Sequence, residues 1–331
     1  MEIKAADVMK LRKMTSAGMM DCKKALTEAE GDFQKAMDII REKGKLVAAK
    51  RADRETSEGA VKARINGSKG ILVCLGCETD FVSRNSDFQE LAEAIADVAI
   101  ANTPADLEGL KACKMADGQT VAEAVEAQTG KTGEKHVVAY YALVEAPFIK
   151  EYIHKVNGKL GALVGFNKGV VEDIAKGFAM QVASMNPVAV SAADCPQEVV
   201  DNELKVAIEK TKEELVKKAV DSALSKAGIN PAHVDSDAHI ESNMSKGWIT
   251  PEQAEKAREI IKTVGEEKAA NLPEQMVQNI AKGRLQKFFK ENTLEEQEYT
   301  MSDDKKTCKA VLAEADKEAK VVAFKRFSLN D

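Results

Sequence analysis

Residues 66–75, NGSKGILVCL, recur in changed form as residues 157–166, NGKLGALVGF, at an offset of 91. Each copy leads into an apolar helical segment that ends at a proline, and these two residues, Pro104 and Pro187, are only 83 apart. The first copy therefore has eight additional residues between its strand and its helix, in the loop of residues 77–85, CETDFVSRN. Because packing explains the shared parts of a duplicated scaffold, the unshared loop is the first candidate functional site.

The repeat predicts a two-part α+β core with small antiparallel sheets. The first half, residues 59–147, has predicted strands at 60–65, 70–77 and 137–144 and helices at 88–101 and 121–128. The second half, residues 148–198 with 290–331, has predicted strands at 149–155 and 160–166 and a helix at 170–185. A β-rich run at 321–327, VVAFKRF, is expected to rejoin the second sheet.

Residues 1–45 are predicted to form three short helices. The residues expected to face inward are Val8 and Leu11 in the first helix and Met19, Cys22 and Leu26 in the second. Asp32 is placed to cap the third helix, because its side chain can accept hydrogen bonds from the free N–H groups of a first turn. Residues 46–58 are charged and alanine-rich without a clear apolar stripe, which predicts a linker.

Residues 199–289 are predicted to form an antiparallel helical hairpin with additional helices at its tip. Apolar positions recur every three or four residues and predict one narrow seam of the coiled-coil type, made of Val200, Leu204, Ile208, Thr211, Leu215 and Ala219. The sequence GINP at residues 228–231 interrupts the first helix, and further helices are expected at 254–264 and 273–289.

Composition and charge narrow the function classes. The 331 residues are 44% apolar, which suffices for two or three domains with real cores. The net charge is −6, although residues 1–64 carry +4, and a pI near 5.6 with 5% aromatic residues argues against an RNA-binding surface. The sequence has no apolar run of about 18 residues, so we expect no membrane-spanning helix. The start lacks the apolar segment of a signal peptide, and six dispersed cysteines suit a reducing cytosol, so we expect a cytoplasmic protein.

Residues that could carry chemistry form no recognisable reactive site. Cys74 and Cys77 lie in an apolar strand rather than at a helix N-terminus, and no further ligands complete a zinc site. Residues 130–132, GKT, lack the glycine and the preceding strand of a phosphate-binding loop. The four histidines have no metal-ligand spacing, and no catalytic triad is evident. We expect no catalytic residue, no metal site and no cofactor.

Three features are candidates for contact with a partner. Met19 and Met20 cannot both face one small core, so one of them is expected to be an exposed, pliable contact residue. Phe81 has two interpretations: either it packs on the core while Asp80 caps the next helix, or it is an aromatic wedge with a carboxylate beside it. His154 ends a strand just before the second turn of the repeat, either as a solvated residue or as a contact residue.

At these residues the chain resembles the elongation factor Ts family of bacterial translation. One match covers Leu11, Arg12, Thr15 and residues 17–26, AGMMDCKKAL, and another covers residues 77–82, CETDFV, with Asn85. Weaker matches lie at residues 152–154, 283–288 and 294–297. The resemblance implies a ubiquitin-associated-like three-helix domain, a two-part α+β core and a protruding helical hairpin. The chain differs from the family at Ser16 and at residues 135–139. It also differs at about residues 211–266, which make the hairpin longer than the family's common form.

The resemblance also implies a function without bond chemistry, that of a guanine-nucleotide exchange factor for the GTPase elongation factor Tu. The implied partners include no nucleic acid and no membrane. The resemblance does not decide whether the factor forms a homodimer. The residues that would act near the Mg²⁺ side of the GTPase are Thr79, Asp80, Phe81 and Val82, with Phe81 as the wedge. Those that would hold the GTPase elsewhere are Arg12, Met19, Met20 and Lys23 in the first domain and His154 in the second core half. The alternative is a non-exchanging adaptor that uses the three-helix domain and the hairpin for oligomerisation.

Overall fold

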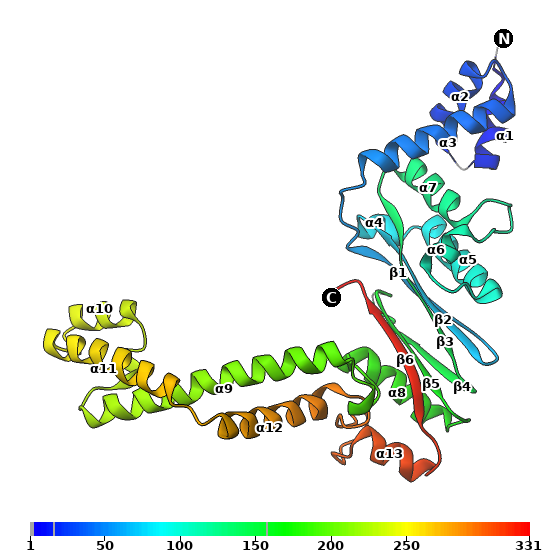
Figure 1. Cartoon of the computed structure of the whole chain (residues 1–331). Coiled ribbons are helices and arrows are strands. Elements are labelled where there is room, and N and C mark those ends of the chain that lie inside the picture. The colour runs from blue at the N-terminus through cyan, green and yellow to red at the C-terminus, as the bar shows by residue number, and fades with distance from the viewer. Residues whose placement is uncertain (1–2, 16, 157) are drawn as a thin grey trace. The chain divides into compact units, whose positions relative to one another are not determined.

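A computed structural model describes residues 3–15, 17–156 and 158–331 of the chain. Ser16, where the chain differs from the family, and Asn157, which opens the second copy of the repeat, lie outside the described residues. The chain divides into two compact units (Figure 1). Unit 1 contains Met1–Val190 and Glu298–Asp331, and unit 2 contains Ser191–Gln297.

Two three-stranded antiparallel sheets form the centre of unit 1, which confirms the predicted α+β class (Figure 1). Their orders are β1-β2-β3 and β4-β5-β6. The strands are β1 (Glu58–Asn66), β2 (Lys69–Cys77), β3 (His136–Glu145), β4 (Phe148–Ile153), β5 (Leu160–Phe166) and β6 (Val321–Ser328). The β-rich run near the C-terminus does rejoin the second sheet, because β6 pairs with β5 with Gly161 opposite Phe327.

The two copies of the repeat adopt matching local structures. β2 and β5 are the central strands of their sheets and lead to α5 (Ser86–Asn102) and α8 (Glu172–Met185). Both helices end in a left-handed residue directly before a proline, Thr103 at φ 42° and ψ 57° and Asn186 at φ 44° and ψ 55°. The additional residues of the first copy include one short helix, α4 (Asp80–Ser83).

β2 separates two hydrophobic cores, because successive side chains of a strand point to opposite faces. On one face Ile71, Val73 and Leu75 pack in a core shared with α5. On the other face Leu72 and Cys74 pack in a core shared with β4 and β5 of the second sheet. Burial raises the pKa of the Cys74 thiol to about 12, as expected for a core cysteine rather than a reactive one.

Three helices form the N-terminal part of unit 1, as predicted: α1 (Ala5–Thr15), α2 (Met19–Glu28) and α3 (Phe33–Lys50). Val8 and Leu11 are buried, which confirms their inward positions. Asp32 caps α3, since its side chain accepts hydrogen bonds from the amides of Gln34 and Lys35 at 2.8 and 3.1 Å.

The predicted inward position of Met19 is wrong. α2 begins at this residue, and its buried stripe starts one turn later with Cys22, Ala25 and Leu26. Met19 is 50% exposed and Met20 is 64% exposed, so both methionines face solvent where one was expected to be buried. Ala17 and Cys22, on either side of the two methionines, belong to the small core, whereas Met19 and Met20 lie on the exposed side of the same turn.

α3 extends to Lys50, through the first five residues of the predicted linker, because it packs against α7 (Val121–Thr132). α7 is fixed at its start by a capping box in which Thr120 and Glu123 exchange hydrogen bonds. Among the described residues of unit 1, three helices had no prediction: α4, α6 (Leu107–Ala112) and α13 (Cys308–Ala315).

Unit 2 is a helical hairpin with a folded tip. Its long helix α9 (Gln197–Lys226) packs against both α11 (Pro251–Ala270) and α12 (Glu274–Asn292). The tip also contains two short 3₁₀ and α segments, η2 (Pro231–His233) and α10 (Asp237–Ser245), and η1 (Ala192–Asp194) precedes α9. A separate hydrophobic core at the tip includes Leu224, Val234 and Ile240.

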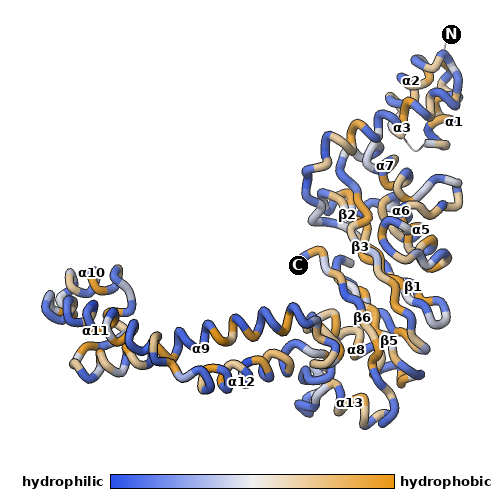
Figure 2. The backbone as a smooth tube through the Cα atoms, viewed as in Figure 1, coloured by the Kyte–Doolittle hydropathy of each residue, from blue (hydrophilic) through white to orange (hydrophobic). Residues whose placement is uncertain are grey.

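The single seam predicted along α9 is only partly correct. Thr211 is fully buried, but Leu204 and Leu215 are half-buried, whereas Ala207 and Val220 outside the predicted seam are buried. The reason is that α9 meets two different helices, so its buried side changes along its length. Figure 2 accordingly shows hydrophobic and hydrophilic residues alternating along the whole of α9.

Candidate partner-contact site

The additional loop presents Phe81 to solvent. The residue lies in α4, between β2 and α5, and its side chain is 85% exposed, which excludes the interpretation in which it packs on the core. Its neighbour Val82 is half-buried and packs against the core that β2 shares with α5. The short helix is thus anchored by Val82, while the side chain of the preceding residue, Phe81, is exposed.

Asp80 does not cap the helix that follows the loop. Its carboxylate forms an ion pair with Arg84, with Oδ2 and Nη2 3.3 Å apart, and both side chains are exposed. Asn85 is the residue that caps α5, since its side chain accepts a hydrogen bond from the Asp87 amide at 2.9 Å. An exposed ion pair adds little stability, so the Asp80 carboxylate stands at the surface beside Phe81.

Two carboxylates, those of Glu78 and Glu134, accept hydrogen bonds at the start of this loop. The amide and the hydroxyl of Thr79 both donate to Glu134, at 3.1 and 2.8 Å. Glu78 accepts from the Lys135 amide at 2.6 Å and from Arg51 Nη1 at 2.9 Å to each oxygen. Burial opposes ionisation of Glu78, but the hydrogen bonds from Lys135 and Arg51 outweigh it and hold the pKa of Glu78 below its usual value.

A second group of candidate residues lies on the N-terminal helices. Arg12 of α1 and Met19, Met20 and Lys23 of α2 are all exposed. Methionine side chains adapt to irregular partner surfaces, and the two basic residues add positive charge beside them. The structure places these residues on a different element from the Phe81 loop, so the site consists of separate patches rather than one cleft.

His154 follows the last residue of β4, as its predicted strand-end position requires. It is half-buried, and its Nδ1 lies 3.0 Å from the Tyr152 hydroxyl. The turn after it is tied to the first sheet, because the Val61 amide donates to the Gly158 carbonyl at 2.7 Å. His154 also lines a groove of about 410 Å³ along β1.

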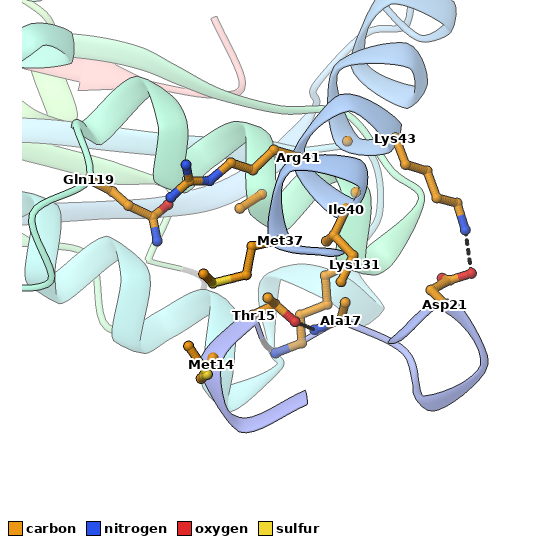
Figure 3. A pocket seen from close by; sticks show the side chains of 13 residues that line it. Met14, Thr15, Ala17, Asp21, Met37, Ile40, Arg41, Lys43, Gln119 and Lys131 are labelled. Atoms are coloured by element: carbon orange, nitrogen blue, oxygen red, sulfur yellow. Dashed lines mark hydrogen bonds and ion pairs between the residues drawn. The ribbon is translucent and has the colours of Figure 1, made fainter. Parts of the chain in front are cut away.

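A small cavity lies where α3 meets α7 (Figure 3). Met14, Met37 and Gly130 are among its lining residues, and so are Lys43 and Asp21, which form an ion pair (Figure 3). Its volume of about 70 Å³ is far below the roughly 300–1,000 Å³ of small-molecule sites. We therefore regard it as a gap in helix packing.

Within residues 3–15, 17–156 and 158–331, no group of three or more His, Cys, Asp or Glu residues is arranged to hold a metal ion. Over the same ranges, none of the helices combines the length and the apolar composition needed to cross a membrane.

Glu134 and Arg51 were not predicted as parts of the site. Glu134 is 55 residues from Thr79 in the sequence, and no local pattern marks it. One signal was available, because antiparallel pairing of the strands that end at Cys77 and begin at His136 places residue 134 opposite residue 79.

The fold and the site together define a class, a duplicated α+β protein with a helical hairpin whose candidate site is an exposed aromatic residue and not a cluster of reactive groups. The family model for elongation factor Ts matches residues 78–230 and 221–331. Curated proteins named elongation factor Ts are similar along the full chain. Those of Bacteroides fragilis and Bacteroides thetaiotaomicron are 57% and 55% identical over 329 residues, with 99% of each chain covered.

The similarity extends to a more distant relative, elongation factor Ts of Porphyromonas gingivalis, which is 38% identical over 330 residues, 100% of this chain and 99% of that protein. The chain therefore belongs to the elongation factor Ts family of translation elongation factors. The lengthened hairpin is not peculiar to this chain, since these relatives match it from end to end.

Proposed function

We propose that this chain is a guanine-nucleotide exchange factor for elongation factor Tu. It binds the GDP-bound GTPase, promotes release of GDP by disturbing the Mg²⁺ and phosphate site, and stabilises the nucleotide-free state until GTP binds. The factor itself makes and breaks no covalent bonds. Membership of the elongation factor Ts family supports this proposal.

The thermodynamic requirement for such a factor is differential affinity. A factor that binds the nucleotide-free GTPase more tightly than the GDP complex lowers the affinity for GDP by the same ratio, because coupling between two sites is reciprocal. Mg²⁺ demands near-ideal octahedral geometry, so a small displacement of its surroundings is costly. A bulky side chain that inserts nearby is an effective way to create that displacement.

The observation that carries the proposal is the exposure of Phe81 on a loop that is held in place. Burying a phenylalanine side chain in a partner is worth roughly 1.5–3 kcal/mol. The chain leaves this side chain 85% exposed while Thr79, two residues earlier, is fixed by Glu134. A rigid, solvent-facing aromatic residue is the type of group that anchors protein–protein contacts.

We assign a role to each patch. Phe81 is the wedge, Asp80 supplies an adjacent negative charge, and Thr79 and Val82 hold the loop. Arg12, Met19, Met20 and Lys23 grip the GTP-binding domain away from the wedge. His154 contacts another domain of the GTPase. Contacts spread over several patches keep the factor bound while the wedge displaces the Mg²⁺ surroundings.

Release of fluorescently labelled GDP from elongation factor Tu tests the proposal. We expect the purified chain to accelerate release in the presence of excess unlabelled GDP, in a manner that saturates with its concentration. The alternative function, an adaptor that uses the three-helix domain and the hairpin, predicts binding without acceleration. A bound complex with an unchanged release rate would therefore favour the adaptor.

A further inference from the structure

At the start of the Phe81 loop, the Glu134 side chain takes the place of a backbone acceptor and continues the contact of β2 with β3. The last backbone pair of these strands joins Cys77 to His136. In the same antiparallel register, Thr79 lies opposite Glu134. At this position the Glu134 carboxylate accepts both the amide and the hydroxyl of Thr79, at 3.1 and 2.8 Å.

The helix that carries Phe81 depends on this contact. α4 has only four residues, and a helix this short does not persist without external support. Thr79 is its N-cap residue, yet the Thr79 side chain makes no capping hydrogen bond to α4, because its hydroxyl is directed to Glu134. At the other end, Ser83 is buried and its carbonyl accepts from Gln89 at 2.6 Å.

Glu134 is itself held in a fixed position. It follows Gly133, which ends α7 in a left-handed conformation at φ 75°. Its amide donates to the Thr132 hydroxyl at 3.1 Å, and its carbonyl lies 2.9 Å from Nδ1 of the buried His136. The carboxylate therefore presents two acceptor oxygens to Thr79 from a rigid turn.

We propose that Glu134 is a positioning residue for nucleotide exchange, whose carboxylate fixes Thr79 and so sets the direction in which Phe81 faces the GTPase. The inference rests on the proposed exchange function and deepens it. A loop that is ordered before binding spends none of the interaction free energy on its own ordering, so more of that energy is available to displace the Mg²⁺ surroundings.

Release of labelled GDP at saturating concentrations of each variant is the primary measurement. We expect Glu134→Ala to slow release about 10-fold, equivalent to ~1.4 kcal/mol, and to change the half-saturating concentration less than about 3-fold. Thr79→Ser keeps both donors and should release GDP at the wild-type rate. Thr79→Val loses only the hydroxyl donor and should show an intermediate loss. Glu108→Ala, at an exposed ion pair with Lys111, is the matched control and should match wild type.

A double-mutant cycle separates positioning from a general structural role. If Glu134 acts through Phe81, then adding Glu134→Ala to Phe81→Ala should slow release less than about 2-fold further. Fully multiplicative losses would overturn the proposal, since Glu134 would then act by another route. Thermal unfolding of each variant establishes that the measured protein is folded, and Thr79→Val provides the same test if Glu134→Ala is unstable.

The outcomes distinguish this proposal from the exchange function on which it rests. Slow release by Phe81→Ala together with a wild-type rate for Glu134→Ala would overturn the positioning role and leave the wedge intact. Unaccelerated release by the wild-type chain would overturn the exchange function and the positioning role together. The proposal is supported if Glu134→Ala releases GDP slowly even at saturating concentrations, while Thr79→Ser releases it at the wild-type rate.

Discussion

Gly44 of α3 and Gly130 of α7 meet backbone to backbone. A Cβ built on Gly130 would lie 2.8 Å from the Gly44 Cα, whereas a Cβ built on Gly44 would come no closer than 3.4 Å, to the Glu126 carbonyl. The crossing of these two helices therefore depends on glycine at position 130 more than at position 44. It joins the three N-terminal helices to the rest of unit 1.

The first prediction follows from this asymmetry. Gly130→Ala should destabilise unit 1 by about 1–3 kcal/mol, because the helices must separate to admit the methyl group. Gly44→Ala should be neutral or slightly stabilising, since alanine favours a helix over glycine by up to ~1 kcal/mol. Urea unfolding of the two variants measures the difference. Equal stabilities would show that the helices do not cross at this contact.

The second prediction concerns the exposure of Phe81. Phe81→Ala should change the free energy of unfolding by less than about 0.5 kcal/mol, as is usual for exposed residues. Phe88→Ala, a few residues later in the buried face of α5, should cost about 3–5 kcal/mol. In release of labelled GDP from elongation factor Tu, the folded Phe81→Ala variant should be slow. A large loss of stability with normal release would exclude the wedge.

The third prediction concerns the exposed methionines of α2. Replacing Met19 and Met20 together by alanine should leave thermal unfolding unchanged but weaken binding to nucleotide-free elongation factor Tu by about 10-fold or more, since the minority of contact residues that carry most of the binding free energy each cost over ~1 kcal/mol when truncated. Met276→Ala in α12, at a residue 47% exposed, is the control of similar exposure. Calorimetric titration measures both. Wild-type affinity for the double variant would remove α2 from the interface.

The fourth prediction concerns the tip of unit 2. Replacing residues 223–265 by a short turn removes most of the separate tip core but leaves the packing of α9 on α12 around Thr211, Val277 and Ala281. We expect this variant to stay helical and to accelerate GDP release within about 3-fold of wild type. A loss above about 10-fold in the folded variant, worth ~1.4 kcal/mol, would show that the tip contacts the GTPase.

The fifth prediction concerns pH. Burial lowers the pKa of His136 below its ordinary value of 6.5, against a weaker opposing effect of the Glu134 carbonyl. The unfolded state therefore binds a proton that the folded state does not as pH falls below about 6.5. Stability is full above that pH and declines toward the folded-state pKa, by at most ~1.4 kcal/mol per pH unit.

His136→Asn should flatten this decline, because the side chain no longer titrates. Urea unfolding between pH 8 and pH 5 compares the variant with wild type. Parallel curves for the two proteins would show that His136 titrates alike in both states, contrary to its burial.

The sequence by itself located the strands of the duplicated core and its helices α5, α7 and α8, but not α4, α6 or α13. Alternating and continuous apolar runs located the six strands that the described residues form, and the repeated NG turns and terminal prolines related the two halves to each other. These signals are local, because strand period and turn chemistry depend on neighbouring residues. The eight-residue difference between the copies likewise located the Phe81 loop, and the local capping pattern at Asp32 located the start of α3.

Only the tertiary structure decided which side chains face solvent and what holds them. Met19 has the spacing of a core residue, yet it is half exposed although Ala17 and Cys22 on either side of it are in the core. The contact of Glu134 with Thr79 spans 55 residues, and that of Gly44 with Gly130 spans two helices far apart in the chain. Such contacts depend on how strands and helices are placed in space, whereas periodicity within one segment specifies only which of its own faces is apolar.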